Sequence, residues 1–307
     1  MIILGIETSC DETALCLLEV KEDSQDGKGI TYRTLGNLVL SQIGTHEQYG
    51  GVFPMLAKRE HAKNLVPLLE KLIKESGIAT STLPAGKQTD DAIESVQNLL
   101  SEHESDLLKH VMESSLISQK PAIDRIAVTY GPGLEPALWV GVNFTRALHT
   151  LWNVPVVAVN HMEGHIVSSL SPSIQKDFTQ LGSLPVPSLG LLISGGHTEL
   201  VKIESIGKYE IIGATRDDAV GEAFDKVARM LGLTYPGGPQ VSRLAAEARA
   251  SKLPHSVVLP RPMKSSKDLD FSFAGLKTAV LYALQKIESE RPDAEKGQPL
   301  PAVHRST

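Results

Sequence analysis

The spacing of apolar residues changes repeatedly along the chain, and each spacing predicts one type of element. Apolar stretches at 2–6, 123–129 and 154–159 predict buried strands. Apolar residues three or four positions apart predict helices over 54–76 and 137–152. Strand and helix signals therefore alternate along the chain, which favours an α/β architecture.

Residues 79–121 differ from their surroundings. The segment opens with a linker-like composition, and its apolar residues then recur at helical spacing among Asp, Glu and Ser: Ile93, Val96, Leu100, Leu107, Leu108 and Val111. This pattern predicts a helical hairpin inserted on the surface of the first half of the protein. We expect the insertion to be dispensable for stability.

Two segments far apart in the chain share one pattern. At 3–17 and at 189–201, an apolar strand leads into a tight turn of small or hydroxyl residues, and a second strand follows. In the later segment, Gly195 and Gly196 leave backbone N–H groups open to a phosphate. One Gly-Gly hairpin is usually only a turn, but two matched hairpins suggest a duplicated fold that clamps a nucleotide between two lobes.

His161 and His165 stand four positions apart, directly after the predicted strand at 154–159. On a helix this spacing places both imidazoles on one face, where they can bind one divalent metal. The alternative is a pair of ordinary surface histidines. A zinc protease carries its catalytic Glu next to the first His, whereas Glu163 lies two positions after His161 and points away from it. Protease chemistry is therefore disfavoured.

Composition narrows the class of protein. The 307 residues suffice for two lobes with separate cores, and 41% of them are hydrophobic. The net charge of −6 argues against a broad nucleic-acid-binding surface. Cys10 and Cys16 are a poor basis for a disulfide framework or a zinc site. The chain opens directly on a strand and has no long apolar run, so we expect a cytoplasmic protein that does not enter a membrane.

Short motifs that are each only moderately specific form a very specific set when taken in order. They occupy residues 5–13, 49–52, 131–134, 161–165, 194–198, 217–226, 235–239 and 270–273. On these motifs the chain resembles the tRNA N6-adenosine threonylcarbamoyltransferases, and most of all the bacterial catalytic subunit, whose family was formerly labelled O-sialoglycoprotein endopeptidase.

The resemblance implies the two-lobed actin-like fold of sugar kinases and Hsp70 ATPase domains. We expect a first lobe at 1–159, a second lobe at 160–287 and an irregular tail at 288–307. The family continues with a Gly-Gly-Val-x-x-Asn loop and a Thr-Asp-Asn segment that supplies a third metal ligand, and neither motif follows Phe273 here. We therefore expect a C-terminally truncated form with little transferase activity alone.

The activity that the resemblance implies is transfer of the threonylcarbamoyl group from L-threonylcarbamoyl-adenylate to N6 of adenosine 37, in tRNAs that read codons beginning with A. The implied partners are tRNA, a paralogous actin-like subunit and a small P-loop ATPase. One alternative is a non-catalytic, actin-like nucleotide-binding subunit that regulates a partner complex. A metalloprotease is a weaker alternative.

The resemblance also assigns the site. His161 and His165 would bind one divalent metal, with Fe²⁺ expected and Zn²⁺ or another ion possible. Glu12 would take or relay a proton. The substrate-binding residues would be Leu192, Ile193, Ser194, Gly195, Gly196, Asp225 and Gly238. A carboxylate such as that of Asp225 suits a ribose because it accepts hydrogen bonds from hydroxyl groups.

Overall fold

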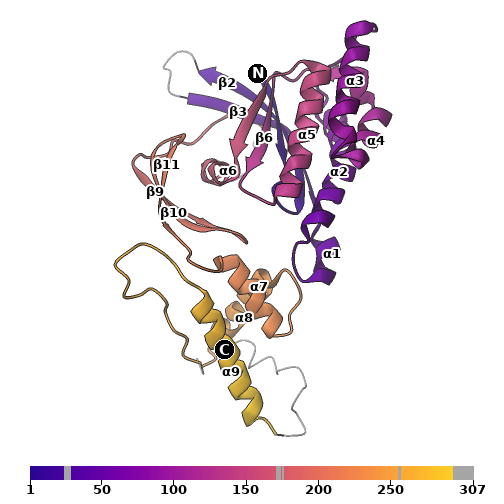
Figure 1. Ribbon diagram of the computed structural model, residues 1–307. Coiled ribbons are helices and arrows are strands. Elements are labelled where there is room, and N and C mark those ends of the chain that lie inside the picture. Colours follow the sequence, from indigo (N-terminus) through magenta and orange to yellow (C-terminus); the bar gives the residue numbers. More distant parts are fainter. Residues whose placement is uncertain (24–28, 171–173, 175, 255–256, 293–307) are drawn as a thin grey trace. The chain divides into compact units, whose positions relative to one another are not determined.

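The structure is a computed structural model that describes residues 1–23, 29–170, 174, 176–254 and 257–292 (Figure 1). The chain divides into two compact units. Unit 1 comprises Met1–Thr45 and Val52–Leu184, and unit 2 comprises His46–Gly51 and the chain from Pro185 onward.

Unit 1 is built on a mixed sheet with the strand order β7-β6-β1-β2-β3-β8. The strands are β1 (Ile2–Glu7), β2 (Glu12–Asp23), β3 (Gly29–Ser41), β6 (Arg125–Gly131), β7 (Val156–Asn160) and β8 (Thr179–Gln180). The first three strands and β8 pair antiparallel, and β1, β6 and β7 pair in parallel. A short turn joins β1 to β2, whereas the parallel step from β6 to β7 needs a helical crossover. The strands expected at 2–6, 123–129 and 154–159 are confirmed.

Two long helices cover the sheet of unit 1. They are α2 (Pro54–Ser76) and α5 (Glu135–Trp152), and Figure 1 shows them together on one face. Helix α2 begins at a proline, whose fixed φ suits a first helical turn, and ends at Gly77 in the left-handed conformation. Leu65, Leu69 and Phe144 are fully buried between the two helices and the sheet. The helix predicted at 137–152 is confirmed, and it begins two residues earlier.

The segment 79–121 does form the expected helical hairpin. It contains β4 (Thr80–Thr82), α3 (Lys87–Ser101), α4 (Ser105–Glu113), the 3-10 turn η2 (Ser115–Ile117) and β5 (Gln119–Pro121), and β4 pairs with β5 at its base. The hairpin is not a separate surface addition, because Val96, Leu100, Leu107 and Val111 are fully buried in the main core of unit 1, and this burial argues against its being dispensable. The apolar faces of α3 and α4 cover α5 and α2, which would otherwise expose apolar surface.

The described residues of unit 2 form a smaller antiparallel sheet, in the order β11-β10-β9, three α-helices and the 3-10 turn η1 (Glu47–Tyr49). The strands are β9 (Ser188–Ile193), β10 (Thr198–Ser205) and β11 (Lys208–Ala214), and the helices are α7 (Val220–Met230), α8 (Gly237–Ala250) and α9 (Ala274–Glu290). The second hairpin expected at 189–201 is thus the β9–β10 pair. Helix α7 packs against both α8 and α9.

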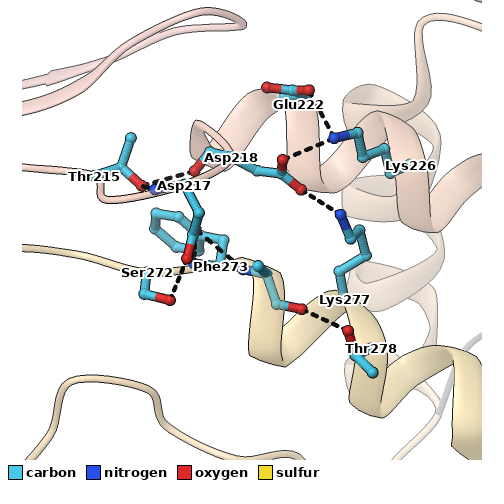
Figure 2. Close-up of polar contacts among 10 residues, drawn as sticks. Thr215, Asp217, Asp218, Glu222, Lys226, Ser272, Phe273, Lys277 and Thr278 are labelled. Atoms are coloured by element: carbon cyan, nitrogen blue, oxygen red, sulfur yellow. Dashed lines mark hydrogen bonds and ion pairs between the residues drawn. The ribbon is translucent and has the colours of Figure 1, made fainter.

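A polar network anchors α9 to the start of α7 (Figure 2). Asp217 accepts hydrogen bonds from Ser272 Oγ at 2.5 Å, Phe273 N at 2.7 Å and Ala274 N at 3.1 Å, so it caps α9. Asp218 pairs with Lys226 at 2.7 Å and with Lys277 at 2.8 Å. These hydrogen bonds from two lysines hold the pKa of Asp218 below its usual value.

The α/β class is confirmed, and the division into two units agrees with the expected two lobes. Unit 1 continues past the lobe boundary expected after residue 159, because α6 (His161–Ser168) packs on β6 and β7. Helix α9 runs to Glu290, and residues 293–307 of the expected tail lie outside the described residues. Within the described part of the chain, no helix combines the length and the apolar character needed to cross a membrane.

Candidate functional site

The paired histidines of unit 1 lie on α6. This helix starts directly after β7, because Asn160 Oδ1 accepts hydrogen bonds from Met162 N at 2.9 Å and Glu163 N at 3.2 Å. The Nε2 atoms of His161 and His165 are 3.0 Å apart. Two imidazole nitrogens that bind one ion at about 2.0–2.1 Å stand roughly 3 Å from each other. The predicted spacing thus gives side chains that converge on one point.

Glu7 orients the first of these histidines. His161 Nδ1 donates to Glu7 Oε2 at 3.3 Å, and its ring therefore leaves Nε2 as the lone-pair nitrogen. Burial raises the pKa of Glu7, but hydrogen bonds from His161, Ser9 and Thr129 outweigh burial and lower it to about 2. An ionised carboxylate behind a ligand histidine fixes the ring and strengthens the nitrogen as a donor to metal.

The residues present fit a divalent metal. The Nε2 atoms converge, and a carboxylate behind one ring orients it, as in histidine pairs that bind a metal. Among the described residues, no group of three or more His, Cys, Asp or Glu side chains could hold an ion. In the described part of the chain, His161 and His165 would be the two protein ligands of such an ion.

Glu12 stands at the start of β2, after the turn at 8–11. Burial and, next, the neighbouring carboxylate of Asp11 raise the pKa of Glu12 to about 7. A carboxyl group with such a pKa can both lose and take up a proton near neutral pH. Burial also raises the pKa of the Cys10 thiol to about 12 and that of Cys16 to about 11, so neither thiol is activated.

The predicted glycine-rich turn of unit 2 links β9 to β10. Ser194 Oγ accepts hydrogen bonds from Gly196 N at 3.3 Å and His197 N at 3.0 Å, which closes the turn. No atom lies within 4 Å of the position that a Cβ would take on Gly195 or Gly196. The first turn of α7 packs against this loop so closely that a Cβ on Gly221 would lie 2.6 Å from Ser194 O. The positive end of a helix dipole therefore lies beside the loop.

Asp225 lies one helical turn further along α7, where it contacts the start of α8 at Gly237 and Gly238. Asp225 Oδ1 accepts hydrogen bonds from Gly237 N at 2.8 Å and Gly238 N at 3.4 Å, so it caps α8. Asp225 also lines a cavity of about 440 Å³, a volume in the range of small-molecule sites. The other lining residues are Glu47, Gln48, Tyr49, Gly50, Arg229, Leu233, Thr234, Tyr235 and Gly237.

Comparison with known proteins decides the family. The family model for tRNA N6-adenosine threonylcarbamoyltransferase matches residues 33–85 and 94–296. The chain belongs to this family. A tRNA N6-adenosine threonylcarbamoyltransferase from Burkholderia ambifaria is 42% identical over 295 residues, which are 96% of this chain and 67% of that protein. One from Burkholderia cenocepacia is 41% identical over the same shares. The chain thus spans about two thirds of the length of these relatives.

Solved structures show weaker similarity. YeaZ from Pseudomonas aeruginosa is 13% identical with a TM-score of 0.33, over 98% of this chain and 99% of that one. The Aquifex aeolicus PPX-GPPA enzyme is 12% identical with a TM-score of 0.33, over 84% and 66% of the two chains. The strand order within each sheet, and not these two similarities, defines the fold.

In this threonylcarbamoyltransferase-family chain, the predicted residues form two groups. His161, His165 and Glu12 lie in unit 1, while residues 192–196, Asp225 and Gly238 lie in unit 2. Their roles stay predictions. Sequence reasoning missed Glu7, although β1, β6 and β7 were each recognisable as strands. Had their parallel pairing been known, the carboxyl ends of β1 and β7 would have placed Glu7 and His161 at one edge of the sheet.

Proposed function

We propose that this protein transfers the threonylcarbamoyl group of L-threonylcarbamoyl-adenylate to N6 of adenosine 37 in tRNAs that read codons beginning with A. The observation that carries the proposal is 41–42% identity, over 96% of the chain, to transferases named for this activity. The geometry supports it because an oriented histidine pair, a carboxyl group with a pKa near neutrality and an open glycine turn are all present.

The reaction is an acyl transfer that releases AMP. The N6 amine attacks the carbamate carbonyl of the mixed anhydride, a new C–N bond forms, and the bond from the carbonyl carbon to the phosphate oxygen breaks. The amine loses one proton, and AMP leaves with the electron pair of the broken bond. An exocyclic adenine amine is a weak nucleophile, so orientation and stabilisation of charge must lower the barrier.

Unit 1 supplies the proton acceptor in this proposal. Glu12 is ionised in a large fraction of molecules at neutral pH, because burial and Asp11 bring its pKa to about 7. A base whose pKa lies near the working pH is both deprotonated in many molecules and basic enough to accept a proton. We assign Glu12 to take the proton of the attacking amine.

Unit 1 would also hold the metal. We propose one divalent ion on His161 and His165, with Fe²⁺ expected from the family and Zn²⁺ or another ion possible. When bound, the ion supplies Lewis-acid stabilisation of negative charge on the donor. Glu7 and Ser9 hold His161 through Nδ1, each at 3.3 Å, and so keep its Nε2 aimed at the ion.

Unit 2 would bind the nucleotide part of the donor. The glycine turn at 194–196 leaves room for a phosphate, since no side chain covers Gly195 or Gly196, and the positive N-terminal end of α7 beside it would stabilise the negative charge. The cavity beside Asp225 would take the nucleoside. Asp225 uses Oδ1 to cap α8, and we assign its other carboxylate oxygen to a ribose hydroxyl.

We propose a cytoplasmic setting, with tRNA, a paralogous actin-like subunit and a small P-loop ATPase as partners. The net charge of −6 supports a dependence on partners, because tRNA binding by a broad basic surface does not fit an acidic protein. Local cations such as Arg59 and Lys63 on α2 are exposed or partly exposed, and they are available for a smaller contact.

The proposed function is tested by measuring tRNA modification by the purified protein. The purified chain, with and without its partner subunits, is mixed with the adenylate and an unmodified tRNA, and N6-threonylcarbamoyladenosine is measured by mass spectrometry of the digested tRNA. Product that disappears in His161→Ala supports the proposal. Nucleotide binding or ATP hydrolysis without any modified tRNA, under every combination of partners, would instead support a regulatory nucleotide-binding subunit.

A further inference from the structure

His61 on α2 is completely buried, and it uses both ring nitrogens to hold the turn between β1 and β2. Its Nε2 lies 3.0 Å from Cys10 O, and its Nδ1 lies 2.7 Å from Thr13 Oγ1. Because a carbonyl oxygen only accepts, Nε2 carries the proton, and Nδ1 accepts a hydrogen bond from the Thr13 hydroxyl. His61 thus forms hydrogen bonds with Cys10, which precedes Glu12 in the sequence, and with Thr13, which follows it.

The turn before Glu12 is fixed at three consecutive carbonyl oxygens, those of residues 9, 10 and 11. The donors are, in order, Leu134 N at 2.7 Å, His61 Nε2 at 3.0 Å and Gln42 N at 2.9 Å. Two of these donors are backbone amides that any residue would supply. His61 is the one donor of the three that a side-chain substitution removes without moving the main chain first.

We propose that His61 is a positioning residue for the transfer reaction, because it sets the direction in which the Glu12 carboxyl group points. This inference rests on the proposed function, in which Glu12 accepts the proton. His61 is fully covered, so it acts through the turn and not by touching the substrate.

Because His61 is buried, the hydrogen bonds at its two ring nitrogens need an explanation. The buried neighbours of His61 on α2 are apolar, including Ala57, Ala62 and Leu65. An imidazole in such a place is costly unless both nitrogens are bonded, and an apolar side chain would fill the space without that requirement. The Thr13 hydroxyl, itself fully buried, completes the pairing.

The titration of Glu12 reports how its carboxyl group is placed, because its pKa depends on its surroundings. Its pKa of about 7 reflects burial and the nearby carboxylates of Asp11, in the same turn, and Glu7, on β1. His61 is the titratable group that α2 places on this turn. If the turn shifts, the depth of Glu12 and its distance from Asp11 change, so the midpoint of its titration changes as well.

Three variants separate positioning from simple support of the fold. His61→Leu removes both hydrogen bonds, while His61→Gln offers one donor and one acceptor in their place. Trp152→Phe is the matched control, since it removes another buried side-chain bond in unit 1, from Trp152 Nε1 to Leu116 O at 3.0 Å, away from the turn. Each variant is compared with wild type in tRNA modification and in thermal unfolding.

We expect His61→Leu to lower kcat by about 10- to 100-fold, the scale of a misplacement of roughly 1 Å, with KM changed less than about 3-fold. His61→Gln should recover most of the lost kcat, and Trp152→Phe should lower the melting temperature without lowering kcat. A His61→Leu protein that folds and keeps wild-type kcat would overturn the proposal.

A second readout does not depend on turnover. The carboxyl carbons of ¹³C-labelled glutamates are titrated by NMR, and the Glu12 signal is assigned by its loss in Glu12→Gln. The Glu12 midpoint should move by at least about one pH unit in His61→Leu and return in His61→Gln. If wild type modifies no tRNA, the proposed function fails, while this titration still decides the role of His61.

Thr13→Val covers the case in which His61→Leu does not fold. It keeps the shape of Thr13 but removes the nearer of two donors to His61 Nδ1, the other being Gln42 Nε2 at 3.4 Å, so the Glu12 midpoint should move in the same direction by a smaller amount. An unchanged midpoint in folded Thr13→Val, with unchanged kcat, refutes the inference.

Discussion

Leu100 tests whether the α3–α4 hairpin is part of the core or an addition to it. The residue lies at the end of α3 with none of its surface exposed, in one core with residues of α2 and α5. Leu100→Ala removes three carbon atoms. Their transfer to water contributes about 2.4 kcal/mol at roughly 0.8 kcal/mol per group. The remaining cavity adds to this loss, so we expect the free energy of unfolding to fall by about 3 kcal/mol.

Urea unfolding followed by tryptophan fluorescence measures this change, because Trp152 is buried in the same cluster. The control is Gln97→Ala, which lies on the exposed side of the same helix and should change the free energy of unfolding by less than about 0.5 kcal/mol. If Leu100→Ala is as mild as Gln97→Ala, the hairpin does not contribute to the core. The view that it is a dispensable surface insertion would then be restored.

Three further outcomes are expected. The pKa of Glu12 in the folded protein, about 7, lies above its unfolded value, so wild type loses stability as pH rises from about 4.5 to 7. Glu12→Gln removes this loss, so its stability relative to wild type should be about 1 kcal/mol higher at pH 8 than at pH 5, after discounting for solvent screening. Urea unfolding of both proteins at the two pH values measures the difference. Gly221→Ala should weaken AMP binding by at least about tenfold in calorimetry, because its Cβ would lie 2.6 Å from Ser194 O, and equal affinity would remove the phosphate assignment to this turn. His165→Ala should lower the bound metal measured by elemental analysis, whereas His149→Ala, on α5, should leave it unchanged; equal metal in both variants contradicts the two-histidine site.

Local sequence patterns predicted the helices and strands, whereas contacts with residues far away in the sequence determine how many side chains are buried or paired. The spacing of His161 and His165 sufficed to place them on one face of a helix, because the i, i+4 relation is set by helix geometry alone. The buried faces of α3 and α4 gave a periodic signal too. However, periodicity reports that a face is apolar and does not report what covers it, so burial of Leu100 against α5 could not be read from the sequence.

The acidic pair at 217–218 shows the same limit in a charged segment. Acidic residues just before a helix such as α7 commonly complement its dipole. In the structure Asp217 instead caps α9, through residues more than fifty positions later, and Asp218 pairs with Lys277 as well as Lys226. Contacts with α9 satisfy these carboxylates more fully than a helix dipole would, and no local pattern contains that information.

Glu7 and Glu12 lie on either side of one short turn, yet their surroundings shift their pKa values in opposite directions. Donors from Ser9, Thr129 and His161 overcome the effect of burial at Glu7 and bring its pKa to about 2, whereas burial and Asp11 bring the pKa of Glu12 to about 7. Two carboxyl groups whose pKa values are separated in this way can divide a reaction between them. In the proposed reaction Glu7 would stay ionised and hold His161, and Glu12 would exchange a proton. The same turn thus joins the orientation of the proposed metal ligand to the acceptance of the proton, which explains why residues 9–11 are bonded from three separate parts of unit 1.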